Sequence, residues 1–294
     1  YHQAGGRLNQ LKKDGFTFDF GPSFFSMSYE FKEFTDYCKI DMPFEFIELD
    51  PLYAVYFADR EEPFMIYKDL EKLAEEFKEI EPQLDEKMRR YLDSAGRLFH
   101  STEDNVFTFL MALTKVPWGH APKMIRTMWK EMERHFTSHE VKVIFSLVSF
   151  FLGATPFDTP AVYSLLSYTE MVHDGYHNVR GGMYKIVEGL LRTFEKEDIN
   201  IVYNTEITGY SEKDGEIDAL IDSKGNRWEA DLYVINSDAA GFRSSVFKRK
   251  KFTEEKLDKK KWTLGPYTLY VGVQGKIDNL HHHTYFLGEN FKDY

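Results

Sequence analysis

The sequence predicts a mixed α/β protein, in which a partial doubly wound domain accompanies a second domain of β-sheet with a helical insertion. Three observations support this prediction. The length of 294 residues is enough for two domains, since domains commonly hold about 100 to 200 residues. Short apolar runs separated by turns occupy both ends of the chain, which is typical of strands. From Asp69 to about Thr155 the apolar residues instead recur at helical spacing.

The first 67 residues are predicted to form strands around one helix. The helix is expected over YEFKEFTDYCKI, and a hairpin at residues 59–63 would join the last two strands. The predicted strands lie in FTFDF, FEFIELDPLYAVYFAD and PFMIY.

The middle of the chain is predicted to be helical and to lack a membrane span. Its longest apolar stretch, VIFSLVSFFLGATPF, has about a dozen residues before Gly153, whereas a spanning helix needs about 20. We therefore expect a protein that is soluble or lies on a membrane surface.

Strands return after residue 175 and alternate with one helix. Gly181 and Gly182 precede MYKIVEGLLRTFEKED, whose apolar residues have helical spacing. The order strand, helix, strand, meander, strand predicts half of a doubly wound nucleotide-binding domain with a small inserted sheet. The strand predictions are INIVYN, TEITGYSEKDG, EIDALIDSKGN and RWEADLYVIN, then YTLYVGVQGKID and HHHTYFLGEN.

Composition excludes several classes of protein. The net charge of −11 argues against nucleic-acid binding, which needs a basic face. The single cysteine, Cys38, excludes an internal disulfide and a thiolate metal cluster, and fits the reducing cytosol.

His281, His282 and His283 are not expected to bind a metal, because consecutive strand residues point to opposite faces. The high aromatic content of 16% indicates either a large apolar pocket or a phenylalanine-rich core.

Three blocks of the sequence resemble the phytoene desaturase family, the carotenoid desaturases within the amine-oxidase-like flavoproteins. The first block is AGGRLNQLKKDGFTFDFGPS, and the second is FFLGATPFDTPAVYSLLSYTEMVHDGYHNVRGGMYKIVEGL. The third block runs from NTEITGYSEKDG to NSDA and then includes LHHHTYFLGENFKDY. The second block is the most specific of the three.

The resemblance implies a discontinuous FAD-binding domain and a substrate domain. The first would comprise residues 1–40 and 176–250, and the second residues 41–175 and 251–294, with the helical insertion at about 69–175. The family's G-x-G-x-x-G segment would precede Tyr1, and its C-terminal flavin segment would follow Tyr294. We therefore expect an internal portion of a longer flavoprotein.

The resemblance also implies an FAD-dependent oxidoreductase. A polyene hydrocarbon offers no group to a nucleophile, and the sequence shows no Ser-His-Asp or Cys-His arrangement, so the cofactor must carry the reaction: hydride leaves an allylic carbon for flavin N5. The alternatives are a saturase or isomerase of the same superfamily acting on another apolar substrate, or a catalytically silent module that binds an apolar ligand or a membrane. We expect a cytoplasmic protein with peripheral membrane contact.

The predicted cofactor contacts come from the matching motifs. Gly5, Gly6 and Arg7 would let the backbone and a guanidinium approach a pyrophosphate, the alternative being a surface turn. Gly21, Pro22 and Ser23 would bring N–H groups near the flavin, the alternative being an ordinary turn with Ser23 as a helix N-cap.

The later motifs supply the remaining predicted contacts. Gly181, Gly182 and Met183 would place a helix N-terminus at the cofactor, the alternative being close packing of helix on sheet. Ile207 matches the family position whose backbone contacts the adenine, and its side chain would otherwise be core. Asp238 either contacts the ligand at a strand end or caps the next helix.

The substrate tunnel and membrane-facing surface are predicted in the helical insertion. The candidate segments are 107–116 and 143–157, with Trp118 and Trp129 as interface anchors. The alternative is that these helices simply pack on one another.

Overall fold

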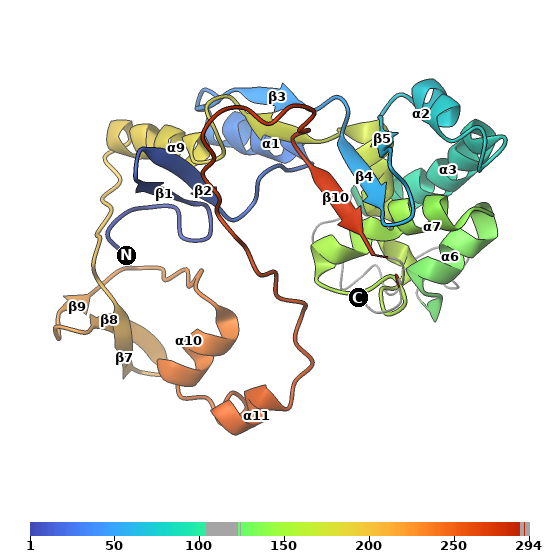
Figure 1. Ribbon diagram of the computed structural model, residues 1–294. Coiled ribbons are helices and arrows are strands. Elements are labelled where there is room, and N and C mark those ends of the chain that lie inside the picture. Colours follow the sequence, from blue (N-terminus) through green and yellow to red (C-terminus); the bar gives the residue numbers. More distant parts are fainter. Residues whose placement is uncertain (104–122, 124, 289–290, 292–294) are drawn as a thin grey trace. The chain divides into compact units, whose positions relative to one another are not determined.

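The computed structural model describes residues 1–103, 123, 125–288 and 291, which form two compact units (Figure 1). The small unit contains Tyr1–Gly6 and Phe194–Trp262, and the large unit contains Arg7–Thr193 and Thr263–Tyr294. The prediction of a mixed α/β class is confirmed. The division into a cofactor domain and a substrate domain stays a prediction.

The described residues of the large unit form three small sheets. An antiparallel hairpin of β1 (Asn9–Lys13) and β2 (Phe16–Phe20) turns at Asp14 and Gly15, which both have positive φ as a tight hairpin turn requires. A second sheet has the strand order β10-β4-β5, in which β10 runs parallel to β4 and the predicted hairpin joins β4 to β5. Its strands are β4 (Tyr53–Phe57), β5 (Phe64–Ile66) and β10 (Thr284–Leu287), and a third sheet pairs β3 (Phe46–Glu48) with β6 (His177–Val179).

Helices fill the predicted insertion, and three of them begin at a polar cap. Asp69, Thr127 and Ser138 accept hydrogen bonds from the first free N–H groups of α2, α6 and α7. The helices of the large unit are α1 (Ser28–Cys38), α2 (Leu70–Glu76), α3 (Leu84–Glu103), α6 (Met128–His135), α7 (His139–Ser146), η3 (Leu147–Leu152), η4 (Ala161–Ser164), α8 (Leu165–Tyr168), η5 (Thr169–His173) and α9 (Lys185–Lys196).

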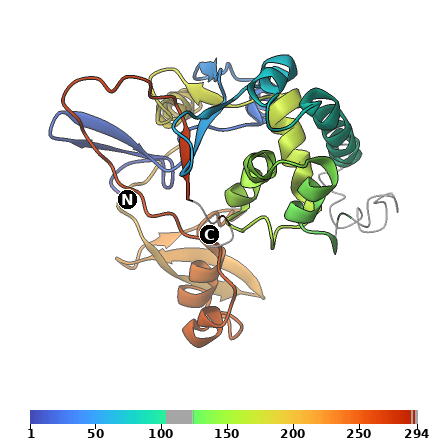
Figure 2. The ribbon, with the colours of Figure 1, turned by 45° about the vertical axis from the view of Figure 1, so that its right-hand side comes forward.

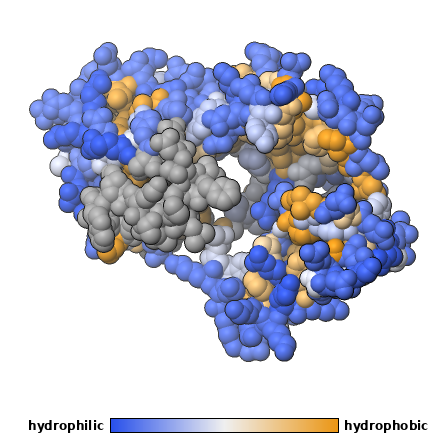
Figure 3. Space-filling view, turned by 180° about the vertical axis from the view of Figure 1, so that it is seen from behind, coloured by the Kyte–Doolittle hydropathy of each residue, from blue (hydrophilic) through white to orange (hydrophobic). Residues whose placement is uncertain are grey.

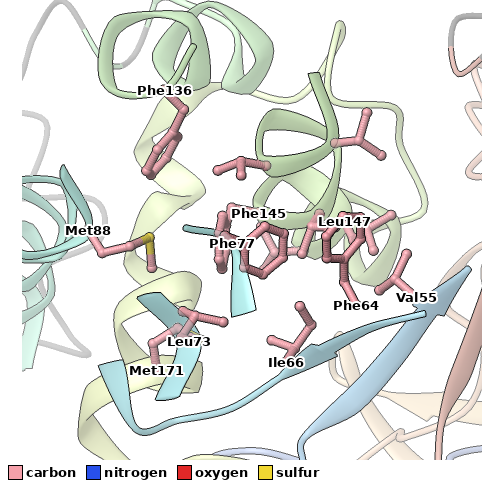
Figure 4. Packing of buried hydrophobic residues seen from close by; sticks show 14 of the residues in the cluster. Val55, Phe64, Ile66, Leu73, Phe77, Met88, Phe136, Phe145, Leu147 and Met171 are labelled. Carbon is pink, nitrogen blue, oxygen red and sulfur yellow. The ribbon is translucent and has the colours of Figure 1, made fainter. Parts of the chain in front are cut away.

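The main core lies where these helices meet the β4–β5 hairpin. The rings of Phe64 on β5 and Phe77 after α2 stack with centroids 4.6 Å apart, and Phe145 from α7 lies against them (Figure 4). Ile66 and Leu73 are completely buried. The hydrophobic effect of this burial holds the helical insertion on the sheet.

Two buried carboxylates hold parts of the helical insertion in place. Glu81, which follows α2, accepts hydrogen bonds from the backbone N–H groups of Thr137 and Ser138 and pairs with Lys87. Burial opposes the ionisation of Glu131 on α6, but hydrogen bonds from His135 and Arg126 and the charge of Lys123 outweigh it and lower its pKa to about 2. Both carboxylates are therefore structural anions.

The small unit consists of a three-stranded antiparallel sheet and two short helices (Figures 1 and 2). Asp222, at the end of β8, accepts hydrogen bonds from Lys224, Asn226 and Trp228 and so fixes the turn into β9. These contacts, led by that from the Asn226 side chain, lower the pKa of Asp222 to about 2. The elements are β7 (Ile207–Lys213), β8 (Glu216–Asp222), β9 (Arg227–Trp228), α10 (Ala239–Ser245) and α11 (Glu254–Asp258).

Two predicted strands are absent from the described residues, and a third is shorter than predicted. Segments 199–204 and 267–278 carry alternating apolar side chains but form no strand, so these predictions were wrong, and the strand predicted over 227–236 is confined to β9, so that 230–236 forms no strand. The reason is that no other strand of the described chain pairs with them, and a strand exists only through its partner. Leu232, Val234 and Tyr267 are consequently at least 78% exposed. Figure 3 shows apolar residues as separate patches on a mostly hydrophilic surface.

Replacing Ile66 by Ala should destabilise the large unit by about 2–5 kcal/mol, because it leaves a cavity in a fully buried site. Chemical denaturation measures the change. The control is Ile125→Ala, which makes the same change at a side chain that is 89% exposed. Equal effects of the two substitutions would contradict this description of the core.

Candidate functional site

Two of the predicted glycine turns, 21–23 and 181–183, lie beside each other in the large unit. Asp19, at the end of β2, accepts a hydrogen bond from the Met183 backbone N–H with an N to Oδ2 distance of 2.7 Å. A Cβ added to Gly182 would lie only 2.6 Å from the same oxygen. The carboxylate of Asp19 therefore joins the two turns, and Gly182 permits its approach.

Arg7 meets the first turn through its backbone. Gly21 has a φ of +98°, and a Cβ at this position would lie 2.0 Å from the carbonyl oxygen of Arg7. No larger residue fits there without moving the chain. Arg7, the 21–23 turn and the 181–183 turn are therefore brought together in one unit.

His282 adds a second connection between the turns. Its Nε2 lies 2.7 Å from the Ser23 carbonyl oxygen, and its Nδ1 lies 3.4 Å from Nδ2 of Asn178. A carbonyl only accepts, so Nε2 carries the proton and Nδ1 accepts from the amide. Asn178 belongs to β6, which leads directly into the 181–183 turn. His282 thus ties β6 to the first turn.

The backbone N–H groups of the second turn are partly occupied. Met183 donates to Asp19, and Gly182 donates to the carbonyl of Val179, while α9 begins only at Lys185. For Gly182 the structure therefore agrees with the alternative given above, in which this glycine allows close packing. A Cβ on Gly181 would meet only the flexible Lys185 side chain, and one on Gly6 would meet nothing within 4 Å. The space beside Gly6 is therefore open, whereas the Lys185 side chain occupies the space beside Gly181.

The remaining predicted contacts belong to the small unit. Gly5 and Gly6 have positive φ, as glycine allows. Ile207 is half-buried and begins β7. Asp238 caps α10 by accepting from the Gly241 N–H at 2.6 Å, which is the structural alternative for this residue. Ser23 is not a helix N-cap, because α1 begins at Ser28 and its N-cap position is Met27.

The predicted tunnel segments have different outcomes. Segment 107–116 and Trp118 lie outside the described residues. Trp129 packs against Phe157 and Phe291 and donates its ring N–H to Glu133. This residue therefore agrees with the alternative that the helices of the insertion pack on one another. In segment 143–157 most apolar residues belong to the core, but Phe151 is 51% exposed. No helix of the described residues is long and apolar enough to cross a bilayer.

An unpredicted acidic group lies inside the large unit. Glu170, on the π-helical turn η5, is 6% exposed, and its Oε1 has no hydrogen-bond partner among the described residues. Tyrosine rings surround it from β4, from the segment before β6 and from β10, with the rings of Tyr53 and Tyr285 5.3 Å apart. Phe24 lies between Tyr176 and His283, at 4.5 and 4.2 Å between ring centroids.

This environment favours the protonated form of Glu170. Burial raises the pKa of the carboxyl to about 7, although hydrogen bonding to Tyr53 and Tyr176 favours the charge and offsets part of the rise. Burial, with the nearby His282, lowers the pKa of His283 to about 4, so this histidine is neutral at pH 7. Glu170 therefore has no cationic partner in its described surroundings.

Sequence reasoning missed Asp19, His282 and Glu170 as site residues. Asp19 is marked only by its place before Gly21, and Glu170 only by being acidic within the aromatic stretch SLLSYTEMVHDGY. Within the described residues, no group of three or more His, Cys, Asp or Glu side chains could hold a metal ion.

Comparison with known proteins identifies the family of the chain. Residues 2–273 match the family described as flavin containing amine oxidoreductase. The chain is 28% identical to a carotenoid 3,4-desaturase of Haloarcula japonica and 26% identical to a zeta-carotene-forming phytoene desaturase of Myxococcus xanthus. The alignments cover 97% and 98% of this chain, but 59% and 57% of those proteins. The resemblance found in the sequence is confirmed.

Solved structures support the same fold. A protein of Pyrococcus furiosus superposes with a TM-score of 0.59 at 12% identity, over 88% of this chain and 57% of that one. A variant of putrescine oxidase superposes with a TM-score of 0.53 at 14% identity, over 84% of this chain and 53% of that one. The chain therefore spans somewhat more than half the length of the proteins it matches.

Replacing Asp19 by Ala should lower the free energy of unfolding of the large unit by about 1–3 kcal/mol, because the Met183 N–H loses its acceptor. Chemical denaturation measures the loss. Asp19→Asn keeps an oxygen at this place and should recover a large part of it. If Asn is as destabilising as Ala, the hydrogen bond is not what joins the turns.

Glu170 should make the large unit less stable as pH rises from about 4.5 to about 7. In this range the unfolded chain releases the Glu170 proton while the folded protein retains it. The stability of Glu170→Gln relative to the native protein should therefore rise by about 3 kcal/mol across this interval. Denaturation of both proteins at several pH values tests this; a difference that does not vary with pH contradicts it.

Proposed function

We propose that this chain, which belongs to the flavin-containing amine oxidoreductase family, forms part of an FAD-dependent carotenoid desaturase. The observation that carries the proposal is the match to carotenoid and phytoene desaturases over 97–98% of the chain. Because the chain spans less than two thirds of those proteins, the activity is proposed for the longer protein.

The proposed cofactor is FAD, which when bound accepts a hydride from the substrate. Arg7 and Gly6 suit its pyrophosphate, since a guanidinium pairs with phosphate oxygens and the space beside Gly6 is open. The backbone of Gly21, Pro22, Ser23 and Gly181 would contact the flavin. Asp19 and His282 would hold these two turns in position. Ile207 and Asp238 remain proposed contacts from the small unit.

The proposed substrate is a long apolar polyene. Its binding needs an apolar surface that excludes water. The proposal is supported by the aromatic group of Phe24, Phe151, Tyr53, Tyr176 and Tyr285 in the large unit, of which Phe151 is 51% exposed. A polyene is dissolved in membranes, so peripheral contact with a membrane surface from the cytoplasm belongs to this proposal.

The longer protein, containing this chain, should copurify with flavin and desaturate a lycopene-series polyene presented in liposomes. Visible absorbance reports the flavin, and chromatography of the polyenes reports new double bonds. Replacing Gly21 by Ala should abolish flavin binding, because its Cβ would collide with the Arg7 carbonyl.

Other results would support other functions. Flavin binding with turnover of a different apolar substrate, by saturation or isomerisation, would favour a relative of the desaturases. A longer protein that binds no flavin would refute the proposal and favour an apolar-ligand or membrane-binding role.

A further inference from the structure

The buried carboxylates of the large unit fall into two kinds. Glu81 and Glu131 each receive several hydrogen bonds and at least one cation, so their charges are neutralised in the fold. Glu170 is also buried, yet one of its oxygens has no partner among the described residues and no cation acts on it. A structural carboxylate would be paired like the other two.

The local backbone around Glu170 is also unusual. Residues Thr169–His173 form a π-helical turn directly after α8. Such turns occur often at functional sites, because the widened turn re-aims side chains. Glu170 thereby reaches the tyrosines of β4, β10 and the segment before β6, instead of solvent.

Aromatic contacts connect Glu170 with the surface. Phe151 is 51% exposed, and its ring lies 6.0 Å from that of Tyr176 and 5.7 Å from that of Phe24. Tyr176, which is 4% exposed, directs its hydroxyl toward Glu170. A series of ring contacts therefore connects an exposed apolar side chain within the predicted tunnel segment to Tyr176, which hydrogen-bonds the Glu170 carboxyl.

We infer that Glu170 is the base that accepts the proton when the polyene is desaturated, a role that rests on the proposed function. A carbon–carbon double bond forms when one carbon loses a hydride and its neighbour loses a proton. Oxidised flavin, when bound, would supply the acceptor for the hydride and its electron pair, and Oε1 of the Glu170 carboxylate would accept the proton. Glu170 then returns its proton to water, and the substrate has lost two hydrogens.

The titratable neighbours support such a role. Tyr53 on β4, Tyr91 on α3, Tyr176 and Tyr285 on β10 interact electrostatically with Glu170. Burial raises the pKa of each of these tyrosines above the ordinary value, so all four stay neutral near pH 7. Glu170, whose pKa is about 7, is the group of this cluster that exchanges a proton near neutrality.

The decisive variant is Glu170→Gln in the longer, flavin-containing protein. It keeps the shape of the side chain but cannot accept a proton. We expect kcat to fall about 10²- to 10⁴-fold, while flavin content and KM stay near the native values. The native kcat should rise with pH around a midpoint near 7, and this rise should vanish in the variant. The matched control is Glu75→Gln, an exposed carboxylate on α2 that pairs with Lys78.

A second variant separates a base from a merely structural residue. Tyr176→Phe removes a hydroxyl that stabilises the Glu170 carboxylate, so the rise in kcat should move to higher pH. Infrared difference spectra between the native chain and Glu170→Gln should show a protonated carboxyl that titrates near pH 7, independent of turnover.

Each alternative outcome overturns the inference in a recognisable way. Native turnover in Glu170→Gln with an unchanged pH profile removes Glu170 from the reaction but leaves the proposed function intact. A Tyr176→Phe profile that does not move, or a carboxyl that titrates near the ordinary value of about 4.3, also refutes it. A longer protein that desaturates no polyene refutes the proposed function and this inference together.

Discussion

A carboxylate inside this protein must be paired or protonated, and this constraint organises much of the large unit. Leaving a buried charge without partners costs several kcal/mol. Glu81 satisfies the constraint by binding the chain between α6 and α7, and Glu131 by binding Arg126 and Lys123. Glu81 therefore connects the chain after α2 to the segment between α6 and α7, whereas Glu131 binds side chains just before α6. Glu170 meets the constraint in the other way, because burial raises its pKa to about 7 and so favours the protonated form.

The second constraint is that a strand needs a partner, and it separates the correct from the incorrect strand predictions. The alternation in FTFDF and YAVYF correctly predicted β2 and β4. These strands form because each pairs with a neighbour that lies close in the sequence, across a short turn. Alternation in 230–236 and 267–278 is just as clear, yet those segments form no strand. Periodicity reports which residues could be buried in a sheet, but it contains no information about whether another strand is present. The pairing of β10 with β4 joins residues more than 200 positions apart, so only the structure reveals it.

For the candidate site too, the sequence could predict features that depend on local conformation, but not those that depend on contacts between distant segments. Motif resemblance located the turns at 21–23 and 181–183, because their glycines have a local conformational role. It could not reveal that Asp19 joins the turns or that His282 ties Ser23 to Asn178, since those contacts depend on how distant segments pack. Glu170 was missed for another reason. A single acidic residue in an aromatic stretch looks like any surface residue until its burial is known.

The segment 170–183 contains both the buried acid and the second glycine turn. Glu170 stands at its start, Tyr176 in its middle, and Gly181 near its end. The pairing of β6 with β3 holds the middle, and the hydrogen bond to Asp19 holds the end. The hydroxyl of Tyr176 hydrogen-bonds the Glu170 carboxyl and favours its charged form. One short stretch of chain thus contains both the proposed cofactor contact and the group that would receive the proton.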